Sequence, residues 1–133
     1  MIMDITFPGG ARVDASFKGF VVQTDQPVYA GGEGSAPPPF QLFLASIGTC
    51  AGIFVLEFCR NRDIPTEGIR MQQIVETDPE TRQVARIVID IILPAGFPER
   101  YVAAVKRAAD LCAVKRLIQD PPEFAIEARI EEE

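Results

Sequence analysis

Residues 37–50 read PPPFQLFLASIGTC, and this stretch decides how the rest of the chain is interpreted. Its three prolines fix φ near the value that a first helical turn requires. Apolar side chains then recur near helical spacing as far as Phe58, and Pro65 cannot continue a helix. We therefore predict one long helix, with Cys50 near its middle and Cys59 near its end.

The longest uncharged run of the chain, Gly34 to Leu56, contains most of this predicted helix. Prolines occupy its start, and glycines and polar side chains interrupt its apolar part, so we interpret it as a buried helix and expect no membrane association. Between Ala45 and Gly52 the side chains are nearly all small. Such a stretch lets another backbone or helix come close.

Short strands are predicted on both sides of the long helix, because apolar side chains alternate between turn residues. The predicted strands are 1–7, 11–17 and 20–23 before the helix, and 68–77, 83–93 and 123–130 after it. A second amphipathic helix is expected to start near Pro94 and to carry Cys112 near its end. This order predicts a single α+β domain over residues 1–133, with antiparallel strands packed on a long central helix and a second helix. The long connection from Thr24 to Pro39 is expected to be functional or mobile.

The composition excludes several classes of protein. With 47% apolar and 24% charged residues, the 133-residue chain can bury a hydrophobic core and is not expected to be disordered. Its net charge of −6 disfavours nucleic-acid binding, which depends on cationic side chains that neutralise phosphates. The chain has no histidine, so a Ser-His or Cys-His dyad, a histidine base and a His-containing zinc site are excluded. Its three cysteines are therefore the main candidates for chemistry.

The cysteines also bear on the compartment and on each other. An odd number of thiols, with no signal peptide visible at the first residues, indicates a reducing cytoplasm. Cys50 and Cys59 lie on opposite faces of one helix and about 13 Å apart along its axis, too far for a disulfide. Cys112 lies on another element, and spacing alone does not decide whether it reaches Cys50. Composition by itself favours inert cysteines that serve as small apolar side chains in a core.

Residues 37–50 resemble the first cysteine motif of the OsmC/Ohr family, in which a proline-led segment opens the central helix and ends in a cysteine. Residues 109–114, ADLCAV, resemble the second motif of that family, which is usually Cys-Pro-Val. The 62 positions from Cys50 to Cys112, with a hairpin and a helix between them, also match the family layout. The resemblance covers nearly the whole chain. It implies an OsmC-like fold in an intertwined homodimer, with both active sites at the interface.

A two-thiol peroxidase is the activity that this resemblance implies. Cys50 is expected to attack an organic hydroperoxide as a thiolate and to become a sulfenic acid, and Cys112 to condense with it to a disulfide. A small dithiol or a dithiol protein is expected to reduce that disulfide. The family arginine comes from the N-terminal strands, where Arg12 is the arginine available. No cofactor and no metal are expected, and the implied function is defence against oxidative stress.

The chain departs from the family pattern near both cysteines. Hydroperoxide reductases of the family carry a glutamate that orients the activating arginine, whereas this chain has Phe40 and Gln41 in that region. Gln41 can form a hydrogen bond but not the ion pair. Ala113 replaces the proline that usually follows the second cysteine, Cys112. The missing carboxylate is therefore the main departure from a hydroperoxide reductase.

The sequence leaves two possible roles open for each of several charged residues. Arg12 is either the activating arginine or a solvated charge on a strand. Glu57, two turns after Cys50 on the same face, either replaces the missing carboxylate or is a solvated side chain. Lys115 and Arg116 are either ordinary partners of a helix C-terminus or cations that lower the pKa of a nearby thiol.

Two other functions remain alternatives to the peroxidase. The absent glutamate and the wide apolar surface of the central helix favour a non-catalytic OsmC-like dimer that binds a small apolar ligand. The third interpretation is a stress-related structural dimer whose thiols are buried. Cys59 is expected to be a core or surface thiol without a role.

Overall fold

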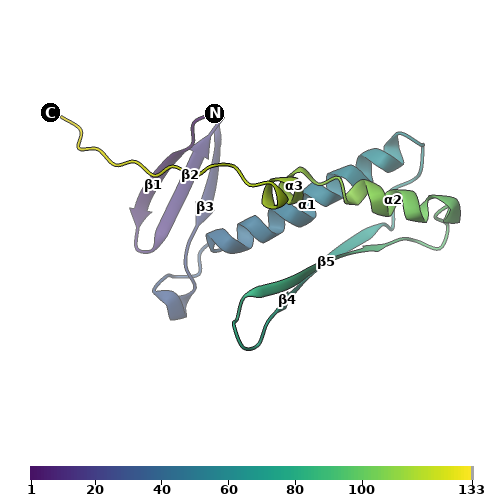
Figure 1. Ribbon diagram of the computed structural model, residues 1–133, viewed down its shortest axis with the longest axis horizontal. Coiled ribbons are helices and arrows are strands. Elements are labelled where there is room, and N and C mark those ends of the chain that lie inside the picture. Colours follow the sequence, from purple (N-terminus) through teal and green to yellow (C-terminus); the bar gives the residue numbers. More distant parts are fainter. Residues whose placement is uncertain (133) are drawn as a thin grey trace. The chain divides into compact units, whose positions relative to one another are not determined.

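The computed structural model describes residues 1–132, which divide into two compact units. The first unit comprises Met1–Ser46, and the second begins at Ile47. The long helix α1, Pro39–Arg60, starts in the first unit and continues in the second (Figure 1). This helix confirms the prediction from the proline run, and the combination of helices with antiparallel strands confirms the α+β class. The single domain over residues 1–133 stays a prediction.

The first unit contains an antiparallel meander. Its elements are β1 (Asp4–Gly9), β2 (Arg12–Phe17), β3 (Phe20–Thr24) and a 3₁₀ turn, η1 (Val28–Ala30). The strands follow the order β1-β2-β3, and Phe17 pairs with Phe20 across the second turn. The turns require positive φ at Gly10 (57°) and Gly19 (81°), which glycine adopts without a steric cost. The three strands predicted before the helix are confirmed, the first of them shifted toward its turn.

A buried carboxylate orders the connection between β3 and α1. Asp25 is 1% exposed and accepts hydrogen bonds from the backbone N–H groups of Gln26, Glu33 and Ser35. It also accepts a bond of 2.6 Å from the Ser35 hydroxyl, which is the largest of the contacts that lower the pKa of Asp25 to about 2. Gly32 lies so close to the Gln26 carbonyl that a side chain there would collide with it. The loop is therefore tied together by its own residues.

The second unit forms its core where one face of α1 meets a hairpin and a second helix. These elements are β4 (Arg70–Thr77), β5 (Val84–Ile92), a 3₁₀ turn, η2 (Glu99–Tyr101), and α2 (Val102–Ala109). Along α1 the buried residues recur at helical spacing and are Ile47, Ala51, Val55, Phe58 and Cys59. The last three of them join Ile64 and Val105 in the hydrophobic core. The predicted hairpin is thus confirmed, with β4 and β5 antiparallel.

The small side chains of α1 let β4 come close to it. A Cβ at Gly48 would collide with the Gln73 side chain, and a Cβ at Gly52 would lie 3.8 Å from the Met71 sulfur. The close approach predicted for residues 45–52 is confirmed within this unit, and the neighbour is a strand.

The second predicted helix is interrupted, which corrects the prediction for Cys112. Helix α2 ends at Ala109, and α3, Ala113–Gln119, starts only after Cys112. The N–H groups of Asp110 and Leu111 close the last turn of α2, and Cys112 takes an extended ψ of 121°. Because the chain changes direction there, the Cys112 side chain is buried, with 2% exposed. Cys112 therefore lies at the N-terminal end of α3 and not near the C-terminal end of a helix.

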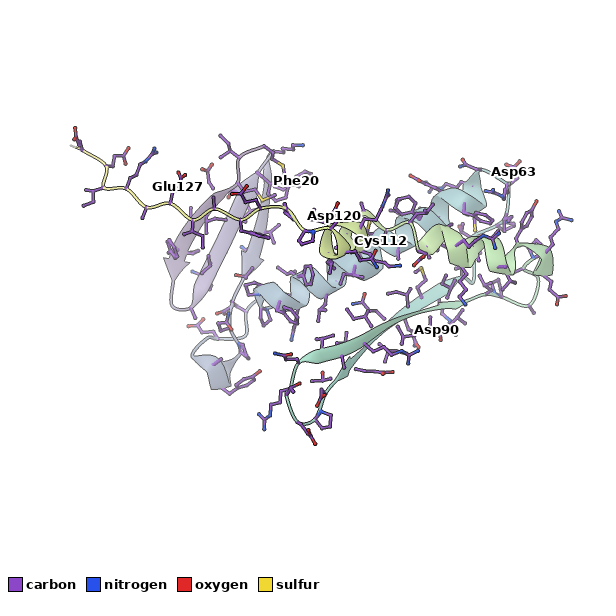
Figure 2. The ribbon with its side chains drawn as sticks, viewed as in Figure 1. Phe20, Asp63, Asp90, Cys112, Asp120 and Glu127 are labelled. Carbon is purple, nitrogen blue, oxygen red and sulfur yellow. The ribbon has the colours of Figure 1, made fainter. Side chains whose placement is uncertain are left out.

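The predicted strand at residues 123–130 is wrong. This segment runs extended around Glu127 and pairs with no other strand within residues 1–132 (Figure 2). Its apolar side chains are almost fully exposed, at 83% for Phe124, 98% for Ile126 and 95% for Ile130. A strand needs a neighbouring edge to accept and donate its backbone hydrogen bonds, and this segment pairs with no edge among the described residues.

Helix α1 also carries large apolar side chains that no core covers. Phe40, Phe43 and Ile53 are exposed. Among the described residues α1 is the one helix long and apolar enough to cross a membrane, a test of length and composition that the core helix of a soluble protein also passes. Helix α1 therefore buries part of its apolar surface in a core and leaves these three side chains exposed in a single copy of the chain.

Replacing Asp25 with asparagine is expected to lower the melting temperature at neutral pH, because a neutral amide is a weaker acceptor for three N–H groups and a hydroxyl. The pKa of Asp25 falls from 3.8 to about 2 on folding. Its carboxylate therefore stabilises the fold fully above the higher value, and this contribution is lost as the pH falls toward the lower one.

Thermal unfolding followed by circular dichroism, repeated at decreasing pH, measures the effect of Asp25→Asn. The gap in melting temperature between wild type and variant should close as the Asp25 carboxylate takes up its proton. Asp90→Asn is the matched control, since Asp90 is an exposed carboxylate on β5. An equal gap for the control, or one that does not narrow in acid, contradicts the role given to Asp25.

Candidate functional site

Cys50 and Cys112 meet where α2 gives way to α3, and Figure 2 labels the position of Cys112 there. Cys50 is half-buried in the middle of α1, and Cys112 is buried at the start of α3. Their side chains lie within hydrogen-bonding range of each other, and both thiols are free. The spacing of the sequence left this meeting undecided, and the break between α2 and α3 brings it about.

The first N–H groups of α3 point at the Cys50 sulfur. The Val114 N–H makes the largest contribution that lowers the pKa of Cys50 from its ordinary value, and the Ala113 N–H and the Cys112 thiol add to it. Burial of Cys50 opposes them, and the net direction is downward. These N–H groups are available because the first turn of a helix has no internal acceptors for them. A proline at position 113 would have no N–H, so Ala113 gives this chain one more donor to the sulfur.

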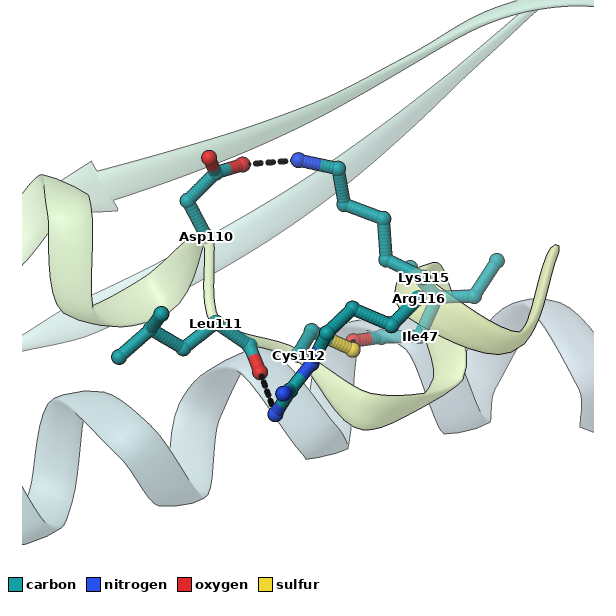
Figure 3. A network of polar contacts seen from close by, with 6 residues as sticks. All are labelled: Ile47, Asp110, Leu111, Cys112, Lys115 and Arg116. Atoms are coloured by element: carbon teal, nitrogen blue, oxygen red, sulfur yellow. Dashed lines mark hydrogen bonds and ion pairs between the residues drawn. The ribbon is translucent and has the colours of Figure 1, made fainter. Parts of the chain in front are cut away.

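Cys112 is fixed by a contact of its own with α1. Its thiol donates to the Ile47 carbonyl at 3.7 Å, three residues before Cys50 on the same helix (Figure 3). A weak S–H donor of this kind orients the sulfur without an ionic partner. Cys112 therefore contacts both Ile47 and Cys50 of α1.

Two cations follow Cys112, and the structure separates their roles. Arg116 lowers the pKa of Cys50 through its positive charge, and its guanidinium donates to the Leu111 carbonyl at 2.9 Å. Lys115 instead forms an ion pair with Asp110 (Figure 3). Both interpretations kept for these residues apply to Arg116, which lies in the last turn of α3 and also lowers the pKa of Cys50.

An apolar groove of about 380 Å³ adjoins the thiol pair. Its lining is mostly aliphatic and includes one of the two thiols: Ile47, Ala51, Ile87, Ile89, Ile91, Lys106, Ala109, Asp110, Cys112, Lys115 and Ile118. This groove was not predicted from the sequence, although the pattern of Ile87, Ile89 and Ile91 indicates an aliphatic surface. Their spacing of two places them on one face of β5, where an aliphatic wall can form.

The other predicted site residues lie elsewhere or stay untested. Arg12 is exposed on β2 in the first unit, and its role beside Cys50 stays a prediction. Glu57 is exposed on α1. Cys59 is 0% exposed in the core, where burial raises the pKa of its thiol and the charge of Arg62 opposes that rise. Cys59 was expected to be either a core thiol or a surface thiol, and the structure confirms that it is a core thiol.

The sequence of this chain is similar to that of a known protein family. The sequence profile of the family described as OsmC-like protein matches residues 32–127. Comparison with curated proteins gives no match.

Solved structures show the same fold. A protein of Psychrobacter arcticus 273-4, provisionally described as an osmotic stress induced and detoxification response protein, has a TM-score of 0.72 and 22% identity, and the match covers 86% of this chain and 85% of that one. An organic hydroperoxide resistance protein, OsmC, from Legionella pneumophila has a TM-score of 0.54 and 21% identity over 89% and 88% of the two chains. A provisionally described organic hydroperoxide resistance protein of Vibrio cholerae, solved with captopril in one of its active sites, has a TM-score of 0.55 and 19% identity over 91% and 86%.

The family match includes both thiols that the structure brings together, and it spans most of the chain. The fold of these solved structures agrees with it over nearly the whole length. The chain therefore belongs to the OsmC-like protein family.

Proposed function

We propose that this protein reduces organic hydroperoxides with a pair of thiols, Cys50 as the attacking residue and Cys112 as the resolving residue. The observation that carries the proposal is a half-buried thiol of lowered pKa in hydrogen-bonding range of a second, free thiol. A thiolate is the nucleophilic form of cysteine, and a neighbouring thiol is what converts its first oxidation product into a disulfide.

The reaction balances with these two residues and one dithiol. The Cys50 thiolate attacks the terminal oxygen of the hydroperoxide, the O–O bond breaks, and the leaving alkoxide takes a proton to become an alcohol. Cys50 is then a sulfenic acid. The Cys112 thiol displaces its hydroxyl as water and forms the Cys50–Cys112 disulfide. A dithiol supplies the two electrons that restore both thiols.

The relatives support the same class of reaction. The structures from Legionella pneumophila and Vibrio cholerae are both described as organic hydroperoxide resistance proteins. Their shared fold with this chain, together with its membership of the OsmC-like family, supports a role in peroxide detoxification. We place the protein in the cytoplasm, where dithiol reductants keep such a pair reduced.

The proposal includes a homodimer. Helix α1 and the unpaired segment at 123–130 both present apolar side chains that a single copy leaves in water. A second copy would cover them if its sheet edge accepted this segment as a strand, since the alternation of apolar residues fits a half-buried strand. In such an intertwined dimer we assign Arg12, from the N-terminal strands, to the activation of Cys50.

Treatment with one equivalent of an alkyl hydroperoxide should convert the wild-type protein to a form that has lost two hydrogen atoms, which intact-mass analysis detects as the Cys50–Cys112 disulfide. Cys50→Ser should abolish peroxide consumption. Cys112→Ser should keep the first attack and stop at the sulfenic acid, which a dimedone adduct traps. Cys59→Ser is the control that should behave as wild type, because Cys59 is buried in the core. Equal oxidation of wild type and Cys50→Ser would rule out the mechanism.

Charged substitutions in the tail should separate the dimer into single chains of 14.6 kDa. Burying a phenylalanine or isoleucine side chain contributes about 1.5–3 kcal/mol, so Phe124→Asp with Ile126→Asp removes several kcal/mol from the association. Light scattering after size-exclusion chromatography measures the mass. Glu127→Ser, on the other face of the same segment, is the control and should stay dimeric. A double variant that is as dimeric as wild type contradicts the proposed strand exchange.

A second candidate function rests on the groove. Its aliphatic lining next to a thiol fits a small apolar ligand, and this would make the chain a non-catalytic binding protein. Saturable binding of a fluorescent apolar probe should then survive Cys50→Ser with Cys112→Ser and be lost in Ile89→Asp, while Asp90→Asn, on the next position of β5, should leave it unchanged. Binding that disappears with the two thiols counts against this alternative.

A further inference from the structure

Arg116 donates hydrogen bonds to two consecutive carbonyls in the short segment that carries Cys112. Its backbone N–H donates to the Cys112 carbonyl at 3.1 Å in the first turn of α3. Its guanidinium folds back and donates to the Leu111 carbonyl at 2.9 Å (Figure 3). One residue therefore ties the start of α3 to the segment that precedes it, and this segment determines where the N–H groups of Ala113 and Val114 point.

The charge of Arg116 is not cancelled by a carboxylate. Within residues 1–132 the ion pairs join Arg86 with Glu76 and Lys115 with Asp110, and neither includes Arg116. The neighbouring cation, Lys115, is therefore neutralised locally, whereas Arg116 keeps its positive charge near the two thiols. A carbonyl accepts the guanidinium hydrogen bond without removing its charge.

We propose that Arg116 is the positioning residue of this thiol site: it braces the Leu111–Cys112 turn and holds a positive charge toward Cys50. The brace keeps the Ala113 and Val114 N–H groups aimed at the sulfur, and the charge favours the sulfur in its anionic form. This inference rests on the proposed function, because it concerns the thiol to which that function assigns the attack.

The charged and titratable groups around the site support a specific role for Arg116. Those that act on Cys50 are Cys112 and Arg116, both from the segment that packs against α1. Lys106, Asp110 and Lys115 line the adjoining groove. Arg116 is exposed, so water and salt weaken its effect, and an interaction of this kind changes an equilibrium by about two- to fivefold.

Alkylation of Cys50 by iodoacetamide tests the inference without any peroxide. The rate is measured by peptide mass spectrometry from acidic to alkaline pH in wild type, Arg116→Gln and Arg116→Lys. Arg116→Gln should raise the apparent pKa of Cys50 and slow alkylation about two- to fivefold at neutral pH, while the rates converge in alkali. Arg116→Lys keeps the charge and should restore most of the wild-type profile.

Two further measurements guard against a merely structural explanation. Arg107→Gln is the matched control, because Arg107 is an exposed cation on α2 outside the groove, and its profile should follow wild type. Added salt should raise the apparent pKa of Cys50 in wild type and have a smaller effect in Arg116→Gln. The wild-type part of this comparison uses no variant, so it stays informative even if Arg116→Gln loses part of its fold.

The inference is overturned if Arg116→Gln leaves the profile unchanged, if Arg116→Lys shifts it as far as Arg116→Gln does, or if Arg107→Gln shifts it equally. These outcomes differ from failure of the proposed function. A protein that forms no Cys50–Cys112 disulfide with a hydroperoxide can still show an Arg116-dependent alkylation profile, and an active peroxidase can lack one.

Discussion

The site depends on where α3 begins. Its first N–H groups have no acceptors within the helix, and two of them, from Ala113 and Val114, are directed at the sulfur of Cys50. If α2 continued without interruption, these groups would bond to carbonyls one turn earlier and would be lost to the thiol. The break at Asp110–Cys112 is thus the feature that turns a cysteine in the middle of a long apolar helix into one with a lowered pKa.

The same break explains the contrast between the three cysteines. Cys112 has an extended backbone at the break and contacts α1. Cys59 instead lies in the core between apolar side chains. Burial with hydrogen-bond donors lowers one thiol pKa, at Cys50, and burial without them raises another, at Cys59. Residue type alone does not distinguish these environments, because all three residues are cysteines on or beside helices.

Much of the fold followed from the sequence, because its signals are local. Three prolines and helical spacing predict α1, and alternation between turn residues predicts the meander and the hairpin. The helix break was missed because Asp110 and Leu111 are compatible with a helix, whereas the contact of the buried Cys112 with α1 is between residues distant in the sequence. The strand at 123–130 was predicted from true alternation, but a strand also needs a paired neighbour, and this segment has none within residues 1–132. The groove was missed because it combines side chains of α1, β5 and both later helices.

Because Cys59 is fully buried, its labelling provides an internal reference for the labelling of Cys50. The core surrounds this thiol, so a reagent reaches it when the core opens, whereas Cys50 is reached in the folded chain. The two residues thereby report on separate events, global opening at one and the chemistry of the site at the other. A single labelling reaction on this chain therefore measures both the rate at which the core opens and the reactivity of Cys50.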